Sequence, residues 1–163
     1  MHKLEEYSNL QDSEYFNDKI NPAGLEIIKS HEGLRLQAYL CPANVLTIGY
    51  GHTGPDVKPK MHITAQEAER LLQTDLAEFE KGVISNLGGA KTNKNQFSAM
   101  VSLAYNIGLT AFKASSVISH HRDGNTSKAA ASFKLWNKGG GKVLPGLTKR
   151  RAAEEALYLT PIK

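Results

Sequence analysis

The sequence contains a single cysteine, Cys41, among its 163 residues. One cysteine cannot form an intramolecular disulfide, so folding does not depend on an oxidising compartment. No stretch comes near the roughly 18 apolar residues that a membrane-spanning helix needs. The first residues, MHKLEEYSNLQDSEYF, also lack the apolar segment of a secretory signal peptide. From the sequence we therefore expect neither a signal peptide nor a signal anchor.

Clusters of metal ligands are absent as well. No group of Cys and His residues has the spacing of a zinc site. His120 and His121 are neighbours in the chain, but adjacent side chains on a helix point about 100° apart and do not face one ion. We expect no metal and no other cofactor.

Acidic residues become scarce toward the C-terminus. Residues 1–33 hold three lysines and seven acids, whereas the chain from Arg122 onward holds nine basic residues and three acids. Such an excess of positive charge indicates a polyanionic partner, which would be nucleic acid, an anionic membrane or an anionic cell wall. The same excess is also typical of an ordinary solvated, lysine-rich surface.

The length fits one domain. Residues 1–20 are polar and acidic, and we expect them to form an extension that is either helical or flexible. The domain proper is then 21–163. It begins with a helix, because Asn21 is a typical N-cap and Pro22 a typical first helical residue, and Gly33 is a natural end for that helix.

Strand patterns follow and then give way to helices. Residues 34–63 predict a small β lobe, with a turn at Pro42-Ala43-Asn44 and a strand over 45–48. Thr64 and Glu67 form a capping box that opens a long helix. Residues 94–160 predict a larger helical lobe. Its expected boundaries are a cap at Thr126 or Ser127, a flexible break at Gly139-Gly140-Gly141, a turn at Pro145-Gly146 and a cap at Thr148. The fold class is therefore α+β, with two lobes joined by a long helix.

Glu32 lies where the first helix should end. Its spacing from Leu25 and Ile28 places it on or beside the apolar stripe of that helix. Partial desolvation and the negative end of the helix both favour the protonated form of a carboxyl, which is the form a general acid needs. An amphipathic helix that merely ends in Glu gives the same pattern.

Two reactions fit the polar residues after Glu32. A nucleophilic Cys41 would need a histidine beside it in space, and no local signature selects one. Glycoside hydrolysis needs a protonated acid, which Glu32 supplies, and a second polar group that orients water. Cys41 and Thr47 together fill that second role. The residues alone favour the hydrolase slightly. Separately, Asp75 lies on the apolar side of its helix and needs a partner, for which His52 is a candidate.

The spacing of Glu32, Cys41 and Thr47 resembles the E-x8-D/C-x5-T motif of bacteriophage-type lysozymes, or endolysins. The similarity continues through QFSAMVSLAYNIG, AFKASS and WNKGGGKVLPGLTKRR, and it covers about residues 22–159. It implies a lysozyme-like fold and a muramidase that cleaves the β-1,4 bond between N-acetylmuramic acid and N-acetylglucosamine by inversion. It also implies a monomer that binds peptidoglycan glycan strands and no nucleic acid.

The resemblance assigns roles residue by residue. Glu32 would be the general acid, Cys41 would lie beside the attacking water, and Thr47 would help to hold that water. The remaining assignments are a structural pair, His52 with Asp75, and four residues of the saccharide cleft, Thr53, Tyr105, Asn106 and Ser115. Tyr105 and Ser115 fit the core and a helix cap equally well.

Cys41 stands where many members of that family have Asp, which leaves the charge at this position open. Three other functions therefore stay open. They are a lytic transglycosylase, a catalytically weakened wall-binding module and direct action of the basic C-terminal half on an anionic membrane. With no leader of its own, the chain would remain in the host cytoplasm until a holin-type lesion released it to the wall.

Overall fold

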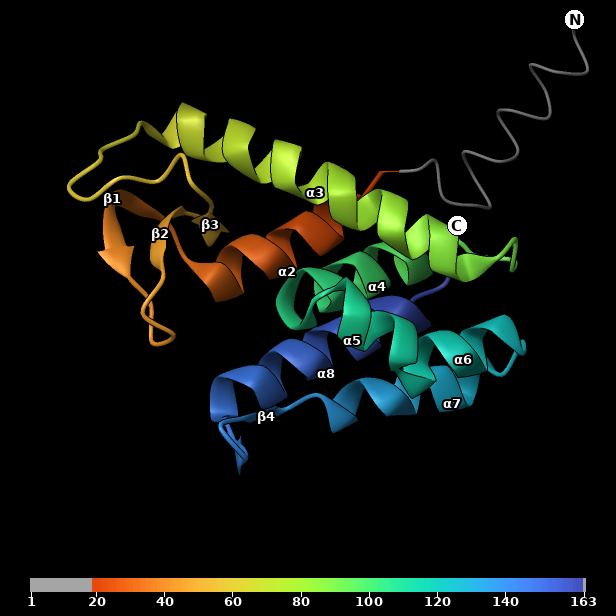
Figure 1. Cartoon of the computed structure of the whole chain (residues 1–163). Coiled ribbons are helices and arrows are strands. Elements are labelled where there is room, and N and C mark those ends of the chain that lie inside the picture. Colours follow the sequence, from red (N-terminus) through yellow and green to blue (C-terminus); the bar gives the residue numbers. More distant parts are fainter. Residues whose placement is uncertain (1–18, 163) are drawn as a thin grey trace, which may run out of the picture.

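The computed structural model describes residues 19–162 and has the expected α+β architecture (Figure 1). A small β lobe and a larger helical lobe are connected by one long helix, as the sequence predicts. The expected extension over residues 1–20 lies almost entirely outside the described residues.

Helix α2, Pro22–Glu32, has the two ends that were predicted for it. The side chain of Asn21 accepts a hydrogen bond from the N–H of Gly24, and Pro22 is the first helical residue. Gly33 ends the helix with φ of 74°, and its N–H donates to the carbonyl of Lys29. Because the helix stops there, Glu32 sits at its last position, at the junction with the small lobe.

The small lobe is a three-stranded antiparallel sheet in the order β1-β2-β3, formed by Arg35–Leu40, Leu46–Gly49 and His52–Thr53. The pairing of β1 with β2 is irregular between Arg35 and Tyr39. A separate small core lies under β2, made of Ile48, Val57, Ile63 and Ala68. Of the apolar residues of β1, Ala38 packs against this core, whereas Leu36 and Leu40 are 41% and 59% exposed.

Helix α3, Ala65–Leu87, connects the lobes and begins with the predicted capping box of Thr64 and Glu67. Its buried face packs against both the sheet and the large lobe. One helix therefore fixes the position of the small lobe relative to the large one.

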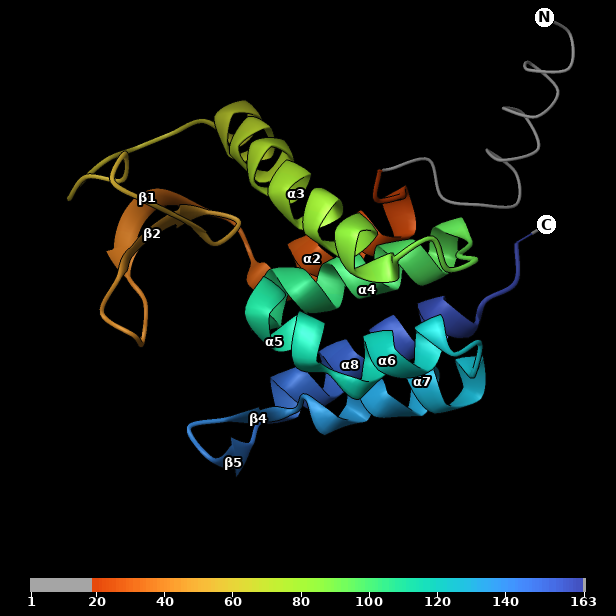
Figure 2. The same ribbon diagram turned by 45° about the vertical axis from the view of Figure 1, so that its right-hand side comes forward.

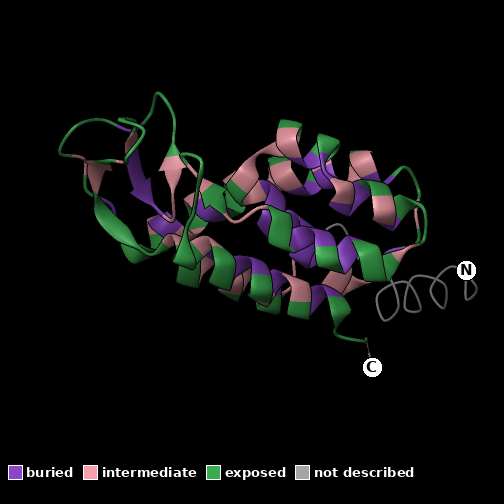
Figure 3. Cartoon of the chain, turned by 90° about the horizontal axis from the view of Figure 1, so that it is seen from below, coloured by how far each residue is buried: buried purple, intermediate pink, exposed green. Residues whose placement is uncertain are grey.

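The large lobe surrounds α4, Lys94–Ile107, in which every residue from Phe97 to Ala104 is buried. The shorter helices α5 (Leu109–Ala114), α6 (Ser116–Arg122) and α7 (Thr126–Ser132) and the final helix α8 (Pro145–Leu159) pack around it, with a 3-10 turn at Phe133–Leu135. Figure 3 shows that buried residues gather on the inner faces of these helices. The densest contact is between α4 and α8.

Several predicted boundaries in the large lobe are wrong. The cap of α7 is Asn125, and neither Thr126 nor Ser127 has that role. The three glycines belong to a hairpin between β4, Lys138–Gly139, and β5, Lys142–Val143, in which Gly139 ends β4 and Gly140 and Gly141 form the turn. Pro145-Gly146 is the start of α8 and not a turn before it, because proline suits the first helical position, so Thr148 lies inside the helix.

Candidate active site

Glu32 lines a cleft of about 390 Å³ between the two lobes. The other lining residues come from the β2–β3 turn and β3, from the middle of α3 and from the end of α4. They are Gly51, Thr53, Asp75, Glu78, Phe79, Tyr105 and Asn106. The cleft thus combines a carboxyl at a helix end with an aromatic wall, in which the rings of Phe79 and Tyr105 meet edge to face at 5.2 Å.

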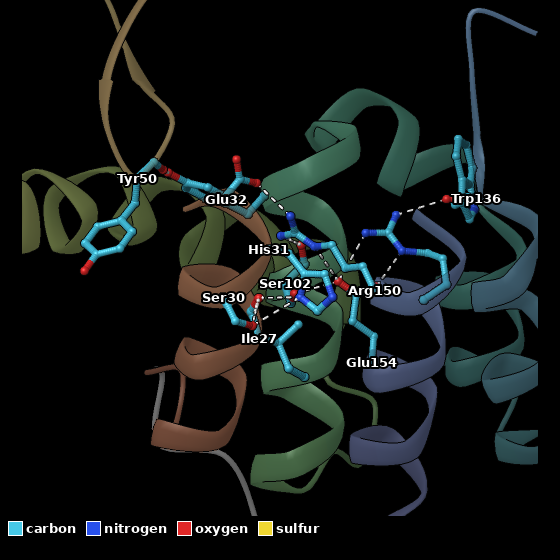
Figure 4. A network of polar contacts seen from close by, with 11 residues as sticks. Ile27, Ser30, His31, Glu32, Tyr50, Ser102, Trp136, Arg150 and Glu154 are labelled. Atoms are coloured by element: carbon cyan, nitrogen blue, oxygen red, sulfur yellow. Dashed lines mark hydrogen bonds and ion pairs between the residues drawn. The ribbon is translucent and has the colours of Figure 1, made fainter. Parts of the chain in front are cut away.

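Arg150 of α8 holds the carboxyl of Glu32. The Nη1 of Arg150 donates to Oε2 of Glu32 at 2.7 Å, and Figure 4 shows the two side chains meeting between α2 and α8. The guanidinium side chain is 3% exposed, whereas that of Glu32 is 22% exposed. The acid therefore faces the cleft while its partner is fixed inside the protein.

Arg150 belongs to a buried polar network (Figure 4). Its Nη2 donates to the carbonyl of Ser102 at 3.1 Å, and its Nε donates to Oε2 of Glu154 at 3.2 Å. The hydroxyl of Ser102 donates to the same Glu154 oxygen at 2.5 Å. On the far side Arg151 lies 2.8 Å from Oε1 of Glu154, and its Nη1 donates to the carbonyl of Trp136. Arg150 and Arg151 thus face Glu32 and Glu154, and the formal charges balance within the network.

This network changes the sequence-based account of Glu32. Desolvation and the end of α2 are both present, but the prediction left out a buried cation 118 residues away in the chain. Any proton donation by Glu32 therefore ends with the resulting carboxylate already paired.

Gly51 lies beside the other oxygen of Glu32. Its φ is 83°, and a Cβ added there would lie 2.9 Å from Oε1 of Glu32. The neighbouring carbonyl of Tyr50 accepts a hydrogen bond from the Tyr105 hydroxyl at 2.8 Å. Burial raises the pKa of Tyr105, with a further contribution from Asp75 and Glu32, so the phenol stays neutral and remains a donor. The turn is thereby tied to α4 and leaves space for the acid.

Cys41 and Thr47 meet around the carbonyl of Val45. The N–H of Cys41 donates to this carbonyl at 3.0 Å, and the hydroxyl of Thr47 donates to it at 2.9 Å. A hydrogen bond from the Val45 backbone, with smaller contributions from Ala43 and Thr47, lowers the pKa of the Cys41 thiol. The turn between β1 and β2 thus brings Cys41 and Thr47 to one carbonyl, but neither is among the lining residues of the cleft.

His52 bridges two carboxylates. Its Nδ1 lies 2.7 Å from Oδ2 of Asp75, and its Nε2 lies 2.9 Å from Oδ2 of Asp56. Burial disfavours the charged imidazole, but the hydrogen bonds to Asp75 and Asp56 outweigh it and raise the pKa of His52. An imidazolium, which carries a proton on each ring nitrogen, can donate a hydrogen bond to both carboxylates at once. The expected contact between His52 and Asp75 is present, and it joins β3 to α3.

The residues predicted to bind saccharide fall into two groups. Thr53, Tyr105 and Asn106 line the cleft together with Glu32. Ser115 is 3% exposed and caps α6, with its hydroxyl donating to the carbonyl of Phe112, so its geometry is that of a cap. Sequence reasoning assigned neither Glu78 nor Phe79 to the cleft, although the period of α3 places Glu78 three residues after Asp75, on the same face.

Among the described residues, no group of three or more His, Cys, Asp or Glu side chains is arranged to hold a metal ion. Three carboxyls line the cleft, those of Glu32, Asp75 and Glu78. Asp75 is paired with His52, whereas Glu32 lies at a helix end and is held by a buried arginine, so the chemistry that the cleft offers is proton transfer from Glu32.

Comparison with known proteins identifies relatives of this arrangement. The family model described as phage lysozyme matches residues 29–154. The endolysin of Salmonella phage P22 is 39% identical over 146 residues, which is 87% of this chain and 99% of the relative. The muramidase domain of SpmX from Asticaccaulis excentricus superposes with a TM-score of 0.80 at 40% identity, covering 88% of this chain and 99% of that one.

Some relatives are longer. The endolysin of Bacillus phage PZA is 49% identical over 142 residues, which is 86% of this chain but 55% of the relative. The chain therefore spans about half the length of that endolysin and nearly the whole of the P22 one.

Proposed function

The chain belongs to the phage lysozyme family, and from this we propose that it is a peptidoglycan hydrolase, specifically a muramidase. It cleaves the β-1,4 bond between N-acetylmuramic acid and N-acetylglucosamine, and Glu32 is the proton donor. The observation that carries the proposal is the placement of Glu32, at a helix end, in the interlobe cleft and held by a buried arginine.

The two oxygens of Glu32 have different tasks in this mechanism. Oε2 stays with Arg150 at 2.7 Å, and Oε1 lies beside Gly51 at the wall of the cleft. Protonated Oε1 donates to the glycosidic oxygen as the bond to the leaving sugar breaks. The carboxylate that forms is stabilised by the guanidinium of Arg150, which is already in place. An interaction that strengthens as charge develops lowers the barrier to the step.

Cys41 and Thr47 orient the water that attacks the opposite face of the sugar. Their shared contacts at the Val45 carbonyl hold Cys41, which follows β1, close to Thr47 in β2. Inversion is the stereochemical outcome proposed, because water attacks directly and no enzyme nucleophile is required. Thr53, Asn106 and the ring of Tyr105 contact the glycan along the cleft, and Ser115 is the weakest of the proposed saccharide contacts.

Product analysis tests this function. Purified peptidoglycan is incubated with the protein, and the released fragments are analysed by mass spectrometry and by NMR of the new anomeric centre. Hydrolysis gives reducing N-acetylmuramic acid ends with inverted configuration. Products with 1,6-anhydro ends would identify a lytic transglycosylase, and binding to the wall without release of fragments would identify a catalytically weakened wall-binding module.

A second experiment tests the role of Cys41. The pH profile of wall clearing is compared for the wild type, Cys41→Asp and Cys41→Ser. If Cys41 acts as thiolate, the wild-type activity rises with pH as the thiol ionises, whereas Cys41→Asp reaches its activity at lower pH. Equal profiles for all three proteins would remove the thiol from the mechanism.

The site of action follows from the substrate. The protein works as a monomer on glycan strands, needs no nucleic acid, and reaches the wall from the host cytoplasm through a holin-type lesion. No helix in the described part of the chain has the length and apolar character to cross a bilayer.

A further inference from the structure

The β4–β5 hairpin stands out from the helices of the large lobe (Figure 2). Lys138 pairs with Val143 and Gly139 pairs with Lys142. Gly140 and Gly141 form the turn with φ of 58° and 79°. Because directly paired residues project from the same face of a sheet, Lys138 and Val143 lie side by side on one face of the hairpin, and Lys142 projects from the other face. Both faces of the projecting hairpin therefore carry a lysine.

Aliphatic side chains are exposed on and around this hairpin. Val143 is 58% exposed, Leu144 is 41% exposed, and Leu135 in the preceding turn is 68% exposed. Large aliphatic groups exposed together on one segment mark a contact surface. We call the set Leu135, Lys138, Lys142, Val143 and Leu144 the hairpin patch.

The charge of this region has one sign. Residues 124–153 contain no Asp or Glu. Arg150 and Arg151 are buried and paired with acids, so they do not contribute to the outer surface. Lys138 and Lys142 are exposed, and among the described residues neither has an acidic partner. The hairpin patch therefore offers free ammonium groups beside exposed aliphatic ones.

This combination selects one kind of partner. A second copy of the chain would bring lysines against lysines, and like charges in contact disfavour association. A purely polar polyanion accounts for the lysines but leaves the aliphatic side chains unused. The surface of an anionic lipid bilayer satisfies both, since phosphate groups attract lysine while short aliphatic side chains enter the interface.

We propose that the hairpin patch is a peripheral binding site for anionic lipid bilayers. Lys138 and Lys142 contact lipid phosphates, and Leu135, Val143 and Leu144 insert at the level of the headgroups. The contact holds the enzyme at the membrane face. It does not depend on the hydrolase activity, because neither the cleft nor the network of Glu32 takes part.

Vesicle sedimentation tests the proposal with the full chain. Vesicles of phosphatidylcholine with about one third phosphatidylglycerol are compared with pure phosphatidylcholine at low ionic strength. The wild type binds the anionic vesicles. Each lysine near an anionic surface increases the binding affinity about fivefold. Lys138→Gln with Lys142→Gln removes two such lysines and should therefore weaken binding about 25-fold. Leu135→Ser with Val143→Ser weakens it at least about fivefold while leaving the charge unchanged.

A matched pair elsewhere controls for net charge. Lys81→Gln with Lys113→Gln removes the same two charges from exposed positions on α3 and α5 and leaves vesicle binding within about twofold of the wild type. The hairpin variants clear lipid-free wall at the wild-type rate. The proposal is overturned if the wild type does not bind anionic vesicles or if the two double lysine substitutions weaken binding equally. It is also overturned if Leu135→Ser with Val143→Ser binds as tightly as the wild type. It is also overturned if the hairpin variants keep vesicle binding but lose activity on wall, which would assign the patch to substrate.

Discussion

Replacing Arg150 by Met tests whether the buried network positions the acid. Methionine keeps much of the side-chain volume and removes three donors, those to Glu32, Glu154 and the carbonyl of Ser102. Removing one partner of a buried ion pair costs about 3–5 kcal/mol, because the other charge stays buried without compensation. Glu32 is partly exposed and regains water, and the fully buried Glu154 keeps its contacts with Arg151 and Ser102, so we expect the free energy of unfolding to fall by the lower figure, about 3 kcal/mol.

The loss is large against the total stability of a domain, which is about 5–15 kcal/mol. It corresponds to a decrease of roughly 6–12 °C in Tm for a chain of this size. Urea unfolding followed by circular dichroism measures the free energy directly. Arg150→Lys is the matched control, since it keeps the charge but loses the planar fork that reaches three acceptors, and its loss should be smaller.

The same variants separate stability from catalysis. At a temperature where both are folded, Arg150→Met leaves Oε2 of Glu32 without its partner, and loss of orientation lowers kcat by about 100-fold. Initial rates of wall clearing measure this. If folded Arg150→Met clears wall at nearly the wild-type rate, Arg150 does not position the acid, and if its stability equals that of the wild type, the network contributes nothing to the fold.

Three further predictions follow from single contacts. Gly51→Ala pushes a Cβ against Oε1 of Glu32 and lowers kcat. Gly88, with φ of 57°, also has a left-handed backbone but has nothing within 4 Å of an added Cβ, so Gly88→Ala costs only stability, about 1–2 kcal/mol; equal rates for the two variants would contradict this. The pKa of His52 is raised by its contacts in the folded state. The stability that these contacts contribute is therefore full below about pH 6.5 and is lost as pH rises through the folded-state pKa. His52→Asn should accordingly lower Tm more at pH 5.5 than at pH 9. Burial lowers the pKa of His121, which contacts the hydroxyls of Thr92 and Tyr158. This residue therefore makes the wild type less stable as pH falls below about 6.5. His121→Gln should reduce that loss in a plot of Tm against pH.

Local rules predicted the elements whose cause is local. The start of α2 at Asn21 and Pro22, its end at Gly33 and the capping box of α3 each depend on residues within one helical turn, and the structure confirms them. The hairpin at residues 138–143 was missed because its strands are two residues long and carry no alternation, so the glycines between them have the pattern of a flexible linker.

The contacts of the site likewise divide into those with a local cause and those that depend on tertiary packing. The contact between His52 and Asp75 was predicted because a half-buried acid on α3 needs a partner. Arg150 was not predicted, because nothing near it in the chain distinguishes it from its neighbours Lys149 and Arg151. Only the packing of α8 against α4 and α2 brings its guanidinium to Glu32. Long-range electrostatic partners of this kind depend on tertiary packing, which a local pattern does not contain.

The central claim is that Glu32 donates the proton that breaks the glycosidic bond. Glu32→Gln keeps the shape and the contact with Arg150 but removes the acid, and the single-turnover rate of reducing-end formation on purified glycan strands measures the step directly. We expect a decrease of at least about 100-fold, with the strands still bound. A Glu32→Gln variant that forms reducing ends at nearly the wild-type rate would contradict the mechanism.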